Sequence, residues 1–154
     1  MPQKKTLERA RQAKNEGKAP STQASEFVRE EIEEIRQGKH GARSTKQAIA
    51  IGLSKARRAG VKLKPPKKGT VPEETRRQAE REYERSLSGQ KPSPPSPKRS
   101  RASVKALQRE SSEAASKEAL SQQARSAARK RSPVERSMAA KKAARTRAKT
   151  QPVT

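Results

Sequence analysis

The large apolar residues of this chain are distributed unevenly, and their densest group falls in one short stretch, which limits what the chain can fold into. Only 28% of the 154 residues are hydrophobic, with one Phe, one Tyr and no Trp, whereas globular domains contain roughly 45–50% apolar residues on a count that includes Gly. A chain of this kind cannot bury enough surface to offset the entropy lost on folding. We therefore expect one small packed piece between positions 26 and 61, built from Phe27, Val28, Ile32, Ile35, Ile49, Ile51, Leu53 and Val61.

After a short polar helix candidate over about residues 4–16, the first helix of a hairpin is predicted from about residue 21 to Gly38. Val28, Ile32 and Ile35 follow one another at i, i+4 and i+7, which places them on one helical face. Gly38 is the residue type that most easily adopts the left-handed conformation found at helix C-termini.

A second helix carries the clearest local signals. Ser44 and Gln47 form an S-x-x-Q capping box at its start, and Gly60 ends it, with Val61 placed for a Schellman-type contact. Its apolar face consists of Ile49, Leu53 and Ala56.

These features predict an all-α protein with a small helical hairpin over about residues 22–60 and largely disordered or conditionally helical basic arms. The expected division is a basic N-terminal arm (1–20), a helix-loop-helix core (21–62), a Pro/Lys-rich linker with a charged helix near 73–87 (63–100), and an Ala/Lys/Arg-rich tail (101–154). The first helix of the hairpin is acidic and the second basic, which suits closure within one chain or a homodimer through residues 26–59.

Positive charge is the strongest functional signal. The chain carries 39 Lys and Arg against 16 acidic residues, a net charge of +23 and a pI of about 11.3. Spread cations of this kind are typical of nucleic-acid binders, because each one placed on a phosphate releases a condensed counterion. With only Phe27 and Tyr83 for stacking, single-strand binding platforms cannot be built. We expect sequence-tolerant DNA binding through the phosphate backbone, as in a nucleoid-associated, histone-like protein.

Two alternatives stay open. One is an RNA- or ribosome-associated basic protein, which electrostatics alone does not separate from a DNA binder. The other is an interaction or stress protein that dimerises through its hairpin and binds no nucleic acid.

The candidate binding residues fall into three groups. The loop Gly38–Ser44 precedes a helix N-terminus, where free amides and the helix dipole favour phosphate, although an ordinary turn is an equal interpretation. The Ser-Pro-basic-basic run at Ser96 resembles turns of linker-histone tails. With the second helix and the tail, these segments supply Lys39, His40, Arg43, Lys46, Lys55, Arg57, Arg58, Lys98, Arg99, Arg129, Lys130, Arg131, Lys141, Lys142 and Arg145.

Several classes of protein are not expected. The absence of Cys and the single His40 exclude disulfides, Cys-based zinc sites and paired-His metal motifs, so no metal or cofactor is predicted. No catalytic motif is recognisable, and the chain has too few apolar residues to line a large pocket for a small-molecule substrate. We therefore do not expect an enzyme. No run approaches the roughly 20 apolar residues of a membrane span, and the N-terminus lacks the apolar core of a secretory signal. The expected location is the cytoplasm, in a bacterial nucleoid.

A resemblance adds to this interpretation. The run G-K-H-G-x-R-S-x-K-Q-A-I-A-I-G-L-S-x-A-R-x-A-G from Gly38 to Gly60, with the acidic helix before it, resembles the core of a family of short basic bacterial proteins with a domain of unknown function. The resemblance implies a bacterial source more firmly than an activity. The tail from residue 101 resembles the Ala/Lys/Arg-rich tails of bacterial histone-like proteins, in composition only.

Overall fold

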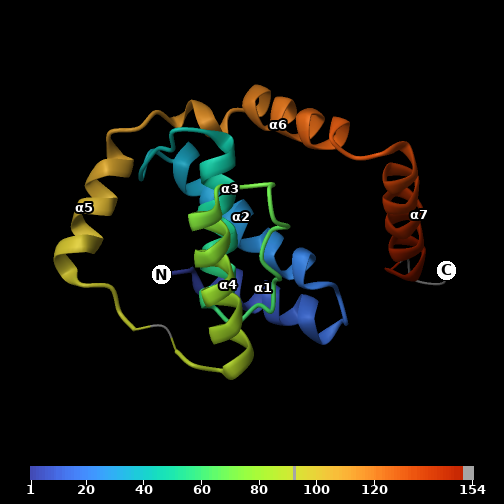
Figure 1. Ribbon diagram of the computed structural model, residues 1–154, viewed down its shortest axis with the longest axis horizontal. Coiled ribbons are helices and arrows are strands. Elements are labelled where there is room, and N and C mark those ends of the chain that lie inside the picture. Colours follow the sequence, from blue (N-terminus) through green and yellow to red (C-terminus); the bar gives the residue numbers. More distant parts are fainter. Residues whose placement is uncertain (92, 151–154) are drawn as a thin grey trace. The chain divides into compact units, whose positions relative to one another are not determined.

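A computed structural model describes residues 1–91 and 93–150, with the side chain of residue 150 left out, and every regular element in these residues is helical (Figure 1). The predicted all-α class is confirmed. Two compact units form: an N-terminal unit, Met1–Ser116, and a C-terminal unit beginning at Lys117. The elements are α1 (Lys4–Asn15), α2 (Pro20–Arg36), α3 (Thr45–Arg58), α4 (Glu73–Ser88), α5 (Pro97–Gln108), the short 3-10 helix η1 (Ser112–Ala115), α6 (Lys117–Arg129) and α7 (Pro133–Thr150).

The predicted hairpin is present as α2 and α3, and its local signals act as expected. The Ser44 side chain accepts a hydrogen bond from the Gln47 amide at the start of α3. Gly38 and Gly60 adopt φ angles of +72° and +93° just beyond the two helices. The hairpin therefore begins and ends where the capping and glycine patterns placed it, within one or two residues.

The expectation of a hairpin standing alone is wrong, because α1, α4 and η1 pack against it. Much of the added burial comes from alanine. Ala10 of α1, Ala24 of α2 and Ala56 of α3 are buried with Phe27 and Val61 in one cluster, and Leu7, Leu53 and Leu63 pack around it. Small side chains allow helices to approach closely, so this core needs few large apolar residues.

The helix α4 packs against α3 and contacts it through a buried carboxylate. Glu82 Oε1 accepts hydrogen bonds from Ser54 Oγ at 2.8 Å and from Arg58 Nε at 3.2 Å. Ala79 is buried on the same side. Arg76 of α4 also pairs with Glu73 and Glu80, at the helical spacings that allow such contacts.

A segment distant in sequence covers the loop between α2 and α3. We call residues 107–115 the strap. The Gly41 and Ala42 amides donate to strap carbonyls at 2.9 and 3.1 Å, and Thr45 Oγ1 donates to the Ala114 carbonyl at 2.7 Å. A Cβ atom on residue 41 would overlap the Glu110 carbonyl. The N-terminal unit consequently includes the start of the Ala-rich tail.

The arms, expected to be largely disordered or conditionally helical, are helical over much of the described residues, where α1 and α5 to α7 form. The helix α4 covers the segment for which a charged helix was predicted. Alanine-rich composition favours helix, and side-chain caps help. The Ser132 amide donates to the Glu135 carboxylate, and the Glu135 amide donates to Ser132 Oγ at the start of α7. Neither α5 nor α6 buries any residue. Among the described residues, no helix has the length and apolar composition that a membrane crossing requires.

Candidate nucleic-acid interface

Carboxylates are concentrated in the N-terminal unit. Fourteen of the sixteen glutamates precede residue 117, so residues 1–116 carry a net charge of +14 and residues 117–154 a net charge of +9 from 11 cations and two glutamates. The predicted binding residues therefore have different electrostatic surroundings, depending on where they lie.

Lys55 forms ion pairs within the N-terminal unit. Its Nζ lies 2.6 Å from Glu31 Oε2 and 2.9 Å from Glu34 Oε2, both on α2. Burial favours the uncharged amine, but the hydrogen bonds and charges of the two carboxylates together outweigh it and raise the pKa of Lys55. Its charge thus joins α3 to α2 through two carboxylates that already hold its ammonium.

Arg57 is likewise internal, with 6% of its surface exposed. Its Nε donates to the Leu63 carbonyl at 3.1 Å and its Nη2 to the Lys64 carbonyl at 3.2 Å. Burial lowers the pKa of this guanidinium, an effect that the charge of Glu82 opposes. Arg57 therefore anchors the chain that leaves α3.

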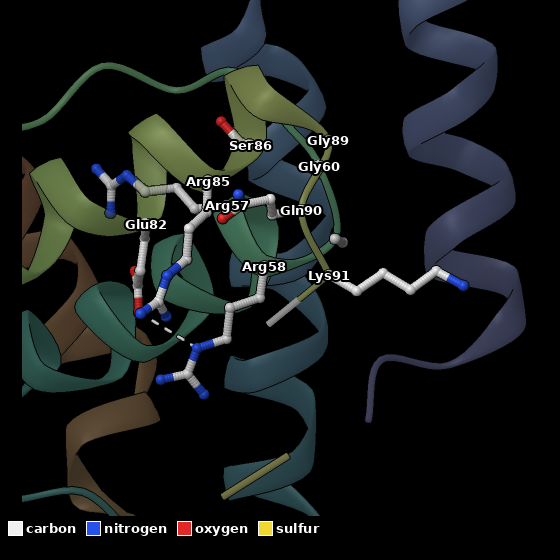
Figure 2. Close-up of a pocket in the computed structure, with 10 residues that line it drawn as sticks. Arg57, Arg58, Gly60, Glu82, Arg85, Ser86, Gly89, Gln90 and Lys91 are labelled. Carbon is white, nitrogen blue, oxygen red and sulfur yellow. Dashed lines mark hydrogen bonds and ion pairs between the residues drawn. The ribbon is translucent and has the colours of Figure 1, made fainter. Parts of the chain in front are cut away.

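Arg58 borders a hollow of about 180 Å³ between α3 and α4, shown in Figure 2. Arg57 and Arg58 both lie beside Glu82 there, whereas the side chain of Lys91 extends away from that carboxylate. The cations around this hollow do not converge on one point, so its geometry does not define an anion pocket.

Most backbone amides of the predicted phosphate site at Gly38–Ser44 already donate hydrogen bonds within the protein. Besides Gly41 and Ala42, which donate to the strap, the Arg43 amide donates to Gln47 Oε1. The side chains of Lys39 and Arg43 are exposed and lie 3.8 Å from Glu34 and Glu110. His40 is half-buried with its ring turned toward Glu31 and Glu34. The loop has the geometry of a closed turn.

Twelve of the predicted cations are exposed, and nine of the twelve lie beyond ion-pair distance of every carboxylate among the residues that the structure describes. These nine are Lys46, Lys98, Arg99, Arg129, Lys130, Arg131, Lys141, Lys142 and Arg145. All but Lys46 lie from α5 onward. These side chains can meet an external anion without first breaking an ion pair.

Helical spacing adds residues that the sequence analysis missed. On α5, Arg101 and Lys105 follow Lys98 at i+3 and i+7, and both are exposed. On α7, Lys149 extends the spacing of Lys141 and Arg145. Residues three and four apart share a helical face, and that periodicity was the available signal. We call Lys141, Lys142, Arg145 and Lys149 the α7 basic face.

Comparison with known proteins shows a similarity over part of the chain. A model described as a family of unknown function, DUF6496, matches residues 11–68, which contain α2, α3 and the C-terminal end of α1. The chain is similar to that family over this region. No curated protein and no solved structure matches the chain. The basic helices α5 to α7 lie outside the matched residues.

Proposed function

We propose that this protein is a sequence-tolerant, nucleoid-associated DNA-binding protein of a bacterium, and that it holds duplex DNA by phosphate contacts from its basic helices. One observation carries the proposal: from α5 onward, eight exposed cations lie beyond ion-pair distance of every carboxylate that the structure describes, while most glutamates lie in the N-terminal unit. The eight are Lys98, Arg99, Arg129, Lys130, Arg131, Lys141, Lys142 and Arg145. An unpaired cation retains its full attraction for phosphate, whereas a paired one must first lose its partner.

The α7 basic face has a spacing suited to a row of phosphates. Lys141 and Lys149 are eight residues apart, which corresponds to about 12 Å along a helix. Phosphates of one DNA strand follow one another at about 3.4 Å along the axis. Four cations over this length can therefore reach neighbouring phosphates of the DNA backbone.

Sequence tolerance follows from the residue types on these helices. Reading bases in the major groove requires groups such as Asn, Gln or Arg held rigidly at base edges. The helix α7 carries Lys, Arg, Ala, Thr and Ser around most of its surface, and no Asn or Gln. Lys and Arg without a fixed scaffold act on the backbone, which has the same charge in every sequence.

The test is binding of a labelled 30-base-pair duplex to the full chain across a salt series. A variant with Lys141→Gln, Lys142→Gln, Arg145→Gln and Lys149→Gln should lower the steepness of the salt dependence by about 3.6, since each phosphate contact contributes about 0.9. The control variant removes the same charge from exposed positions on α1 and should lower the steepness of the salt dependence less. It carries Lys4→Gln, Lys5→Gln, Arg11→Gln and Lys14→Gln.

Three outcomes decide the matter. No binding by the full chain at about 0.15 M salt overturns the proposal. An equal decrease in the steepness of the salt dependence in the two variants overturns the role of α7. Tighter binding to a structured RNA of equal length than to the duplex overturns the choice of DNA in favour of the RNA alternative.

A further inference from the structure

Three potential metal ligands meet where α2 leads into the loop before α3. Glu31, Glu34 and His40 each place one ligand atom within 4.8 Å of the others. The proposed function uses none of the three, and DNA phosphate would not be drawn to two carboxylates. What this cluster binds is a separate question.

The His40 ring has a defined orientation. Its Nδ1 lies 3.0 Å from the Gly41 carbonyl oxygen, and a carbonyl can only accept, so Nδ1 carries a hydrogen. The opposite nitrogen, Nε2, lies 3.4 Å from Glu31 Oε1 and 3.9 Å from Glu34 Oε2. In the neutral ring, Nε2 presents a lone pair to two carboxylates, an arrangement that a cation between them would stabilise. An imidazole that donates its other N–H to a carbonyl is also the usual form of a metal-ligating histidine.

Glu31 is the second observation. Its side chain is fully buried, and its Oε1 accepts no hydrogen bond. Lys55 Nζ forms an ion pair with Oε2 at 2.6 Å, while Oε1 faces His40. A buried carboxylate is costly unless it is paired and hydrogen-bonded. One oxygen thus retains full capacity for a cation on the side of the imidazole.

We propose that Glu31, Glu34 and His40 form a binding site for one Zn²⁺ ion, which would lie between Glu31 Oε1, Glu34 and His40 Nε2. One nitrogen and two carboxylates suit Zn²⁺, whereas Mg²⁺ and Ca²⁺ prefer all-oxygen shells. Zinc bonds of 2.0–2.2 Å in a tetrahedron place ligand atoms about 3.3 Å apart. The distance of 3.4 Å between His40 Nε2 and Glu31 Oε1 already matches this value. The distance of 3.9 Å between His40 Nε2 and Glu34 Oε2 requires a small movement of Glu34.

Lys55 is the competing cation at this site. It shares Glu34 Oε2 at 2.9 Å, so its ammonium repels an ion placed beside that oxygen. Replacing it with a neutral side chain of similar length should tighten zinc binding, although the protein without metal becomes less stable. A purely structural role for the cluster predicts the loss of stability without the gain in affinity.

The experiment is a zinc titration of the full chain followed by NMR of the histidine ring. His40 is the only histidine and the chain has no cysteine, so the ring signals report on this site alone. We expect saturable one-to-one shifts with Zn²⁺ at constant pH and none with Mg²⁺. Calorimetry should show affinity at least about tenfold weaker in Glu34→Gln, since even second-shell changes cost 10–100-fold, and tighter binding in Lys55→Met.

The control is Glu33→Gln, which removes an exposed glutamate next to the site and should leave zinc affinity unchanged. Ring signals that shift with pH but not with zinc would overturn the proposal, because a proton would then be the cation between Nε2 and the carboxylates. Equal affinities in Glu33→Gln and Glu34→Gln would also overturn it, as zinc would then be held by scattered carboxylates. The ring titration needs only the natural chain, so it decides even if a variant fails to fold.

Discussion

A Cβ atom on residue 52 would lie 2.7 Å from the Cα of Val28, so α3 crosses α2 at a glycine. This distance is too short for two carbon atoms without movement of one backbone. The crossing brings α3 close enough to α2 for Lys55 to reach Glu31 and Glu34. The glycine therefore positions the buried charges as well as the backbones.

Gly52→Ala should destabilise the N-terminal unit. Helix propensity alone predicts a gain of about 1 kcal/mol for this change, whereas overpacking of a tight contact costs about 1–3 kcal/mol. We expect the clash to dominate, giving a lower urea midpoint. Ala50→Gly, at an exposed position on α3, measures the propensity contribution in the same helix. A stabilised Gly52→Ala variant would show that the two helices separate easily.

Gly41→Ala should release the strap while α2 and α3 stay packed. The added methyl group overlaps the Glu110 carbonyl, and this breaks the backbone hydrogen bonds from residues 41 and 42. Hydrogen exchange by NMR should show faster exchange of the Ala42 amide and unchanged exchange in the middle of α3. Gly69→Ala is the comparison, since nothing lies within 4 Å of its Cβ position, although its φ of +83° adds local strain. Slow exchange at Ala42 in both variants would contradict this account of the strap.

Acid should weaken the α2–α3 contact through Glu34. Burial by itself raises the pKa of this carboxyl, but the hydrogen bond and charge of Lys55, with the charges of Lys39 and His40, together hold it below the ordinary 4.5. A lowered folded-state pKa stabilises the protein above about pH 4.5, and the contribution is lost as the pH falls through the folded value. The stability difference between wild type and Glu34→Gln should therefore shrink below that pH in urea titrations. For Glu33→Gln the stability difference from wild type should stay small at every pH. A stability difference for Glu34→Gln that does not change with pH would contradict the ion pair between Glu34 and Lys55.

Arg57→Lys should lower stability and leave the salt dependence of DNA binding unchanged. Lysine cannot reproduce the two donors that hold the Leu63 and Lys64 carbonyls, and hydrogen bonds to charged groups contribute about 1.5–3 kcal/mol. Arg58→Lys changes a half-exposed side chain and keeps a cation beside the buried Glu82, so a smaller loss of stability is expected. The checks are urea denaturation and the duplex salt series. A large change in the salt dependence with normal stability would place Arg57 in the DNA interface.

Local signals predicted the hairpin, because caps and glycines act within a few residues of where they stand. Ser44 with Gln47 at the start of α3, and Gly38 and Gly60 beyond the two helices, needed no knowledge of the rest of the chain. The packing of α1 and the strap could not be predicted in this way. Ala10, Ala24 and Ala115 are buried, yet alanine is common on exposed helical faces as well, so its position gives no sign of burial.

The roles of individual cations were the hardest to predict. Lys55 and Arg57 stand near the end of α3, where basic residues ordinarily complement the helix dipole in solvent. Their partners, Glu31 on α2 and the carbonyls after Val61, become neighbours only when the chain folds back. Charge counts along the sequence treat these cations as equal to Lys141 or Arg145, which the structure leaves exposed.

The strap also determines an order of events. Thr45 and Ala114 are 69 residues apart in sequence, and Arg36 and Ala115 are 79 apart, whereas α2 and α3 are joined by a short loop. During synthesis, the paired helices emerge well before the segment that covers their connection. Closing a long loop costs entropy that its late contacts must repay, so we expect residues 107–115 to dock after the main folding barrier. Substitutions there should accelerate unfolding while the folding rate stays nearly constant, which makes this segment the determinant of how long the N-terminal unit persists once folded.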